Sequence, residues 1–87
     1  MSEESPLKFP CEFPIKAMGE DSPGFENLVV NIVDRHVPGE DLRQVRTRGS
    51  RNGRYLAVTV DIRATSRAQL DAIYRELSAH QRVVVAL

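Results

Sequence analysis

Residues 43–60 read RQVRTRGSRNGRYLAVTV, and the fold can be predicted outward from this stretch. Asn52-Gly53 separates two segments of alternating apolar and polar residues, which is the strongest short-range signal for a β-hairpin with a two-residue type I′ turn. In this register the numbers of facing residues sum to 105, as 52 and 53 do, so that Val45 faces Val60. The hairpin is predicted to extend over residues 43–64.

Neighbouring residues of a strand point to opposite sides of the sheet, so the hairpin has an apolar face and a polar face. The apolar face is expected to hold Val45, Thr47, Val58 and Val60. The polar face is expected to hold Arg46, Arg48, Tyr55 and Thr59. Five arginines between residues 43 and 54 make the hairpin basic, although the twelve basic and twelve acidic residues of the whole chain cancel.

Two amphipathic segments flank the hairpin and predict two helices. The first begins at Ser22-Pro23, where the Ser22 hydroxyl can cap an amide of the first turn, and it ends at Val37-Pro38-Gly39. His36 is expected in its last turn, where the helix dipole favours an imidazolium. The second helix begins at Ser66, which has capping-box spacing to Gln69. The predicted apolar stripes are Phe25, Leu28, Val29, Ile32, Val33 and His36 in the first helix, and Leu70, Ile73, Tyr74 and Leu77 in the second.

Two further strands complete the pattern. Residues 13–18 alternate between apolar and polar positions and stop at Gly19, where the backbone is expected to need a positive φ. Residues 83–87 are predicted to form a final, buried strand. The order β-α-β-β-α-β predicts a ferredoxin-like α/β plait, a four-stranded antiparallel sheet with two helices on one face. Residues 1–8 are expected to be a flexible tail, and residues 9–87 a single domain.

The side of the sheet without helices is predicted to be uncovered and to carry the function. Its candidate binding residues are Lys16, Met18, Arg46, Arg48, Tyr55, Thr59, Asp61 and Arg63. Asp61 is expected to pair with a neighbouring cation, as a surface ion pair that contributes about 1 kcal/mol or less. Arg46 and Arg48 project to the same side, about 7 Å apart along one strand, which suits a carboxylate or phosphate group.

Composition and motifs exclude several classes of protein. The 41% hydrophobic and 28% charged residues are typical of a globular domain. Residues 1–13 lack the basic start and apolar stretch of a signal peptide, which predicts a cytoplasmic protein. The single Cys11 and the spacing of His36 and His80 predict no disulfide, metal or other cofactor. No nucleophile or acid–base pair is recognisable, so no catalytic residue is assigned and no enzyme is predicted.

The pattern Phe9-Pro10-x-x-Phe13-x-x-Lys16-x-Met18-Gly19, followed by Arg35-His36-x-Pro38-Gly39, resembles the YbeD family of small bacterial proteins. The resemblance covers residues 9–87, but the density of arginine in the hairpin departs from it. It implies a ferredoxin-like fold similar to ACT regulatory domains, which bind small effectors on metabolic enzymes, and a link to lipoate metabolism. The family brings no agreed catalytic residues. Gly19, His36, Pro38 and Gly39 therefore transfer only as motif residues.

Three functions compete for the uncovered face. The first is a non-enzymatic, ACT-like regulatory or binding module that contacts a metabolic enzyme or a small anionic effector and self-associates as a homodimer. The second is a nucleic-acid-binding module, for which only Tyr55 offers a ring and Ala57 stands where a second aromatic is needed. An unrecognised enzyme comes third. The sequence leaves open whether the hairpin arginines contact a partner or only water, and it predicts no contact with a membrane.

Overall fold

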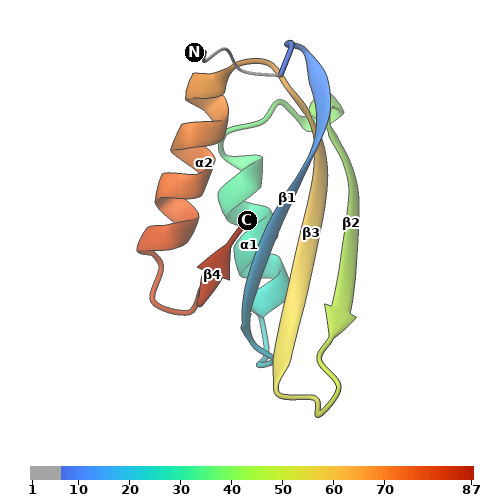
Figure 1. Ribbon diagram of the computed structural model, residues 1–87, viewed down its shortest axis with the longest axis vertical. Helices are drawn as coiled ribbons and strands as arrows, with labels where there is room; N and C mark the ends of the chain where they lie inside the picture. The colour runs from blue at the N-terminus through green and yellow to red at the C-terminus, as the bar shows by residue number, and fades with distance from the viewer. Residues whose placement is uncertain (1–6) are drawn as a thin grey trace.

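The computed structural model describes residues 7–87, which form one four-stranded sheet and two helices (Figure 1). The elements in chain order are β1 (Cys11–Glu20), α1 (Phe25–Asp34), the short 3₁₀ turn η1 (Gly39–Asp41), β2 (Leu42–Gly49), β3 (Tyr55–Ala64), α2 (Arg67–Ala79) and β4 (Val85–Ala86). The strand order is β2-β3-β1-β4, and each neighbouring pair is antiparallel. This is the predicted ferredoxin-like plait.

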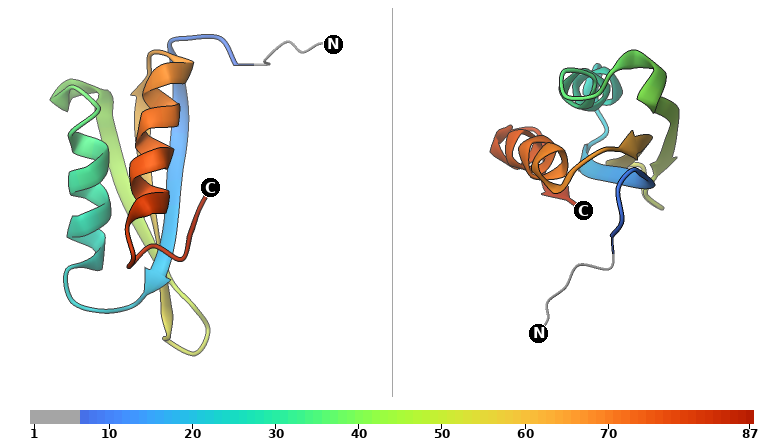
Figure 2. Two further views of the ribbon diagram at one scale, coloured as in Figure 1. Left: turned by 90° about the vertical axis from the view of Figure 1, so that its left-hand side faces the viewer. Right: turned by 90° about the horizontal axis from the view of Figure 1, so that it is seen from above.

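Both helices cover the same face of the sheet, as predicted (Figure 2). They bury alternate residues of the two central strands, and each fully buried Val, Ile, Leu or Phe side chain stabilises the fold by about 1.5–3 kcal/mol. The core contains Ile15, Ala17, Phe25, Val29, Ile32, Val33, Val37, Val58, Val60, Ile62, Ala64, Leu70, Ile73, Leu77 and Val83. Within residues 7–87 no helix or strand covers the other face of the sheet, which we call the open face.

The hairpin has the predicted register but a different turn. Val45 pairs with Val60 and Gly49 with Leu56, so facing residue numbers sum to 105. The two-residue type I′ turn is wrong, because it needs a positive φ at Asn52, and no non-glycine residue between 7 and 87 has one. Instead the Gly53 amide donates to the Ser50 carbonyl oxygen at 3.0 Å, and Gly53 has a φ of +75°. The connection is therefore longer than predicted.

Helix α1 begins later and ends earlier than the sequence pattern indicated. Its N-cap is Gly24, with a φ of +83° and no side-chain cap, so the prediction of a Ser22 cap is wrong. The helix ends at Asp34, which places His36 beyond its last turn. In contrast, the cap of α2 is confirmed, because the Gln69 amide donates to Ser66 Oγ at 3.0 Å.

Strand β4 is an exposed edge strand, so the prediction of a buried final strand over residues 83–87 is wrong. Only Val83 is buried, whereas the exposed fraction is 65% for Val84, 38% for Val85 and 65% for Leu87. The strand lies at the end of the sheet, where one side has no neighbour. The predicted tail, residues 1–8, falls outside the described residues except for its last two, of which Leu7 packs against the core.

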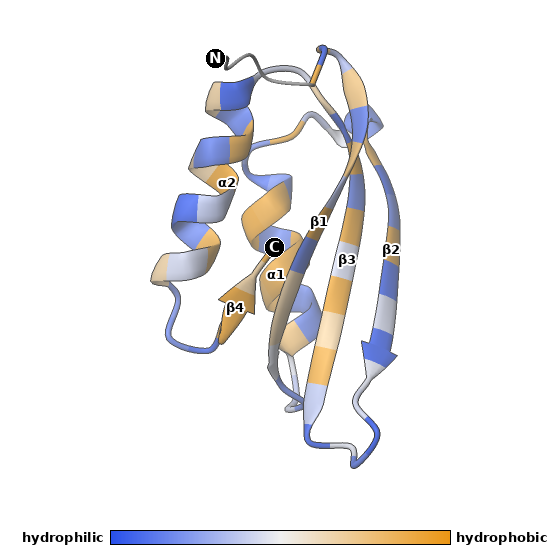
Figure 3. Cartoon of the chain, in the orientation of Figure 1, coloured by the Kyte–Doolittle hydropathy of each residue, from blue (hydrophilic) through white to orange (hydrophobic). Residues whose placement is uncertain are grey.

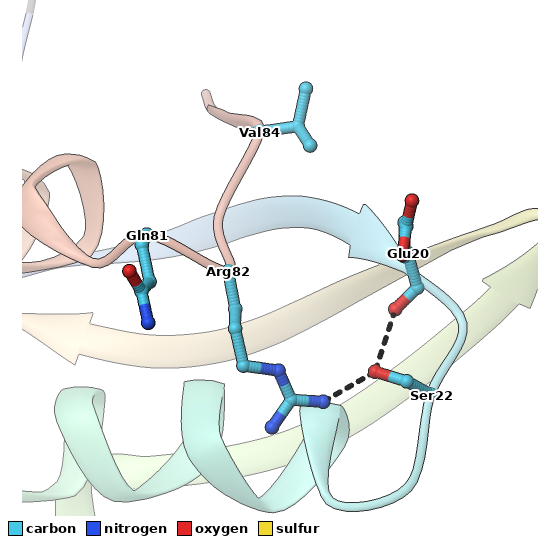
Figure 4. Close-up of a pocket in the computed structure, with 5 residues that line it drawn as sticks. All are labelled: Glu20, Ser22, Gln81, Arg82 and Val84. Carbon is cyan, nitrogen blue, oxygen red and sulfur yellow. Dashed lines mark hydrogen bonds between the residues drawn. The ribbon is translucent and has the colours of Figure 1, made fainter.

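Gly19 is required by a close approach, and not by the positive φ that we expected from its place at a strand end. The Phe25 ring and the Arg82 carbonyl oxygen lie against the Gly19 Cα, so that an added Cβ would stand 2.6 Å from the ring. Arg82 also lies over this ring, 5.9 Å from its centroid, and donates to the Pro23 carbonyl oxygen at 3.0 Å. Figure 4 shows Arg82 reaching across from the segment before β4 toward Ser22.

Replacing Gly19 with alanine is expected to lower the free energy of unfolding by about 1–3 kcal/mol, because the methyl group overlaps a backbone carbonyl and a buried ring. Gly39→Ala is the matched control, since nothing lies within 4 Å of its added Cβ and its φ is not positive. Urea unfolding of both variants measures the difference. Equal destabilisation of the two variants would show that the close approach at Gly19 is not what requires glycine there.

Tyr74 anchors the end of the chain to the helix layer and gives the fold a pH dependence. Its hydroxyl donates to the Leu87 carbonyl oxygen, and its ring meets Phe13 edge-on with centroids 6.4 Å apart. Burial raises the pKa of Tyr74 above its usual value. The folded state therefore keeps this proton to a higher pH than the unfolded chain does, and the resulting stability is lost as the pH rises above about 10.

We expect Tyr74→Phe to remove this alkaline loss. The free energies of unfolding of the natural chain and the variant should differ most near neutral pH, where the hydroxyl is protonated and bonded to Leu87. They should approach each other as the pH rises above about 10, because the Tyr74 hydroxyl can ionise only in the natural chain. Urea titrations at both pH values provide the comparison, and a difference that is the same at both would contradict the argument.

Candidate functional site

The open face is a grid of side chains whose rows run across the strands. One row consists of Lys16 on β1, Thr59 on β3 and Arg46 on β2, and the next of Met18, Ala57 and Arg48. Strand β4 extends the second row with Val85 and, through two backbone hydrogen bonds to Lys16, the first row with Leu87. The structure thus brings together the predicted residues Lys16, Met18, Arg46, Arg48, Tyr55, Thr59 and Asp61 on one surface.

A shallow trough runs along the middle of this face. Its floor is β3, where Ala57 and Thr59 carry short side chains and Thr59 is only 8% exposed. Longer side chains stand on both sides, because Lys16 and Met18 project from β1 and Arg46 and Arg48 from β2. Two hollows of about 380 and 310 Å³ lie over Thr59, the first also lined by Pro14 and Leu87, and the second by Arg48 and Ala57. A smaller one of about 170 Å³ lies between Met18, Tyr55 and Arg48.

Arg46 is not a free cation. Its Nε donates to Asp61 Oδ2 at 3.0 Å and its Nη2 to Asp61 Oδ1 at 2.8 Å, a two-pronged ion pair. These hydrogen bonds and the charge of Asp61 raise the pKa of Arg46 above its usual value. The charge pair predicted for Asp61 is therefore confirmed, and Arg46 is held by a carboxylate of its own chain. The prediction that Arg46 and Arg48 together receive an anion does not fit this geometry.

The arginines of the open face beyond Asp61 also lie close to carboxylates of the same chain. Arg43 lies 3.6 Å from a carboxylate oxygen of Glu12, and Arg63 lies 3.7 Å from one of Asp41. Sequence reasoning placed Arg63 on the open face but did not foresee its partner, which comes from η1. The charges of Arg43 and Arg63 at this end of the sheet are therefore balanced by carboxylates of the same chain.

Lys16 and Arg48 are the cations that remain. The side chain of neither residue forms a hydrogen bond or ion pair with any part of the chain between residues 7 and 87, and both are exposed. They lie in adjacent rows on opposite sides of Ala57 and Thr59. Next to them, the Arg54 guanidinium stacks on the Tyr55 ring, 5.7 Å from its centroid. The electrostatically available part of the open face is therefore the end that contains Lys16, Arg48 and Tyr55.

The motif residue His36 belongs to a different cluster, between the two helices. His36 Nε2 lies 2.7 Å from Glu76 Oε1, and Arg35 contacts the other oxygen of the same carboxylate. Gln69 Nε2 also donates to the His36 carbonyl oxygen at 3.0 Å. Arg35-His36 stands in the pattern that resembles the YbeD family, but a separation of 40 residues gave no signal that His36 meets Glu76. These contacts join the end of α1 to α2.

Pro38 helps to form the turn before β2, and Gly39 is the first residue of η1. The Pro38 carbonyl oxygen accepts from the Asp41 amide at 2.8 Å, which closes η1 ahead of β2. Another hollow, of about 320 Å³, lies beside Glu20, Ser22 and Arg82, but the Arg82 guanidinium already donates to Ser22 and Pro23 there (Figure 4). Within residues 7–87 no group of three or more His, Cys, Asp or Glu residues could hold a metal ion, and no helix is long and apolar enough to cross a membrane.

The fold and this face define a small ferredoxin-like α/β domain with a cationic, uncovered sheet surface. Over residues 4–87 the chain matches the family described as Protein of unknown function (DUF493), and it belongs to that family. The UPF0250 protein of Nitrosomonas europaea is 46% identical to it over 87 residues, which is 100% of both chains. The resemblance to the YbeD family agrees with this membership.

Solved structures confirm the fold class. Protein HP0495 from H. pylori superposes with a TM-score of 0.76 at 13% sequence identity, covering 99% of this chain and 90% of that one. The ACT domain from GTP pyrophosphokinase of Chlorobium tepidum superposes with a TM-score of 0.68 at 17% identity, covering 87% of this chain and 94% of that one. Identities this low show a shared fold alone. The predicted likeness to ACT domains is thus confirmed as a likeness of structure.

Asp61→Asn is expected to free Arg46 and strengthen the attraction of the open face for anions. Because the pair is exposed on the Arg46 side and screened by solvent, the free energy of unfolding should change little. A fluorescent polyglutamate peptide should bind about two- to fivefold more tightly, and the gain should shrink in high salt. Asp71→Asn, the same charge change at an exposed position of α2, is the matched control. Equal effects of both variants would mean that only net charge matters.

Proposed function

We propose that this protein is a non-enzymatic, cytoplasmic regulatory module that binds a partner protein through the open face and thereby changes the activity of a metabolic enzyme. The observation that carries this proposal is that Lys16 and Arg48 form no ion pair within residues 7–87 and lie beside apolar and aromatic side chains of the open face. Arginine, Met and Tyr are enriched at protein interfaces. The ACT-like fold supports a regulatory role by analogy.

A protein partner fits the site better than an enclosed small effector does. Small-molecule sites bury most of the ligand, whereas the hollows over Thr59 and Ala57 lie on a sheet face that no helix or strand of residues 7–87 covers. Catalysis has no support from the same surface, since Lys16 and Arg48 have no acid, base or nucleophile held against them within residues 7–87.

The second candidate function is binding of single-stranded nucleic acid. The observation that favours it is the Tyr55 ring on the open face. The Arg54 guanidinium stacks on this ring, and Arg48 lies beside it. Base stacking on a single ring contributes about 1–3 kcal/mol, so affinity would depend mainly on phosphate contacts and would fall steeply with salt. The position where a second ring would stack holds Ala57, which is why we rank this function second.

Site-specific photocrosslinking in the native cell tests the first proposal. A benzophenone amino acid replaces Ala57 on the open face or, as the matched control, the exposed Ala68 on α2. We expect the Ala57 probe alone to capture a metabolic enzyme, and the purified chain to change the kcat or KM of that enzyme. The YbeD resemblance makes enzymes of lipoate metabolism the first to assay.

The response of the captured enzyme must also depend on the unpaired cations. Lys16→Glu combined with Arg48→Glu should abolish the kinetic effect, whereas Arg67→Glu combined with Arg75→Glu, the same charge change on α2, should preserve it. Identical captures by the two probes, or unchanged enzyme kinetics, would contradict the proposal. Capture of RNA at Ala57 that is lost in high salt would support the second candidate in its place.

A further inference from the structure

The open face changes in character from one edge of the sheet to the other. At the β4 edge it presents Val85 and Leu87, which are 38% and 65% exposed, and Met18 lies next to them on β1. At the β2 edge it presents Arg46 and Arg48. Figure 3 shows this contrast, with β4 in the hydrophobic colour and the lower part of β2 mostly hydrophilic. An occupant that matches this face has one apolar side and one acidic side.

The dimensions of the face match an α-helix. Adjacent strands lie about 4.8 Å apart, so β4 and β2 are separated by about 14 Å, and a helix with its side chains is about 10–12 Å wide. The low line formed by Ala57 and Thr59 runs along the strands between taller side chains, with hollows of about 380 and 310 Å³ over Thr59. A helix laid along this line would cover β1 and β3, and the side chains of β4 and β2 would flank it on either side.

Backbone hydrogen bonding favours a helix over an extended peptide. The face of a sheet offers side chains only, because the amides and carbonyls of β1 and β3 already pair within the sheet. An extended segment lying there would leave its own amides and carbonyls unpaired over Met18 and Ala57. A helix pairs these groups internally and can press an apolar stripe on the surface.

We propose that the open face binds an amphipathic α-helix of a partner protein, with an apolar stripe over Met18, Val85 and Leu87 and an acidic flank against Arg48. This inference rests on the proposed function and specifies the chemistry of the partner. Arg48 receives the acidic flank because Arg46 is held by Asp61. Lys16 lies in the neighbouring row on β1, on the apolar side of the trough, where its stem adds apolar surface while its ammonium group stays in water.

Designed peptides test the inference on the full chain. The first probe is a helical peptide of about 18 residues with leucines at helical i, i+3, i+4 and i+7 spacing and glutamates along one flank. The second has lysines in place of these glutamates. Binding is followed by amide chemical shifts in ¹⁵N–¹H spectra. We expect the acidic peptide alone to bind the natural chain, and the shifted amides to include those of Met18, Ala57 and Arg48.

Charge reversal at one position then tests the orientation of the helix. Arg48→Glu should weaken binding of the acidic peptide about tenfold and strengthen binding of the basic peptide about tenfold. Arg67→Glu on α2 has the same change in charge and should alter neither affinity. Rescue by the basic peptide cannot arise from misfolding, so it separates an interface role of Arg48 from a structural one.

Three results would overturn the inference: equal affinities for both peptides, shifted amides confined to α1 and α2, or absence of binding at millimolar peptide. Each is distinguishable from failure of the proposed function. If the probe at Ala57 captures an enzyme that responds to this chain but neither peptide binds, the partner is not an acidic amphipathic helix and the regulatory function stands. If the Ala57 probe captures nothing that the Ala68 control lacks, the proposed function itself fails.

Discussion

The double pairing of β3 is the constraint on which the rest of the structure depends. This strand pairs with β1 from Tyr55 to Ala64 and with β2 from Leu56 to Ile62, and its side chains alternate between the two faces of the sheet. One register therefore sets both the core and the open face. A slip by one residue would bring Thr59 and Asp61 under the helices and expose Val58 and Val60. The buried valines thus fix the floor of the trough on the opposite face.

Charge pairing determines which cations of the open face are free to attract an acidic group. The face carries several arginines, but Arg46 is bonded to Asp61, and Arg43 and Arg63 lie close to carboxylates. A count of basic residues would therefore overstate its attraction for anions. What remains available is a small region in which Arg48 and Lys16 adjoin apolar and aromatic side chains. Such a region favours a partner with acids at defined positions over a general polyanion.

Most of the fold could be predicted from the periodic patterns of apolar residues in the sequence. The alternation around Asn52-Gly53 predicted the strand register, and the apolar stripes predicted which side of each helix is buried. Both patterns follow from the number of residues per repeat in a strand or a helix. The Ser66 cap of α2 was predictable for the same reason, since its partner Gln69 is three residues away. The same local reasoning predicted that Ser22 caps α1, and this was wrong. Gly24 is the N-cap, and the Ser22 hydroxyl accepts a hydrogen bond from Arg82.

Contacts between distant segments could not be predicted in this way. Nothing in the local sequence shows that Gly19 lies against Arg82, that His36 meets Glu76, or that Asp61 selects Arg46 over Arg48. The valine-rich composition of residues 83–87 is typical of a buried strand, yet their strand lies at the edge of the sheet. Burial there depends on which strands are neighbours, which is a property of the topology and not of the segment.

The two edges of the sheet are chemically unlike, and this difference limits how copies of the chain can assemble. Charged side chains on an edge strand oppose the addition of another strand, and β2 carries Arg43, Arg46 and Arg48, whereas residues 83–87 carry no charged side chain. Continuous growth by strand addition would need an accepting edge on both sides of every subunit. The arginines of β2 oppose strand addition at one edge of this sheet, so its charge pattern disfavours polymerisation even though part of its surface is apolar.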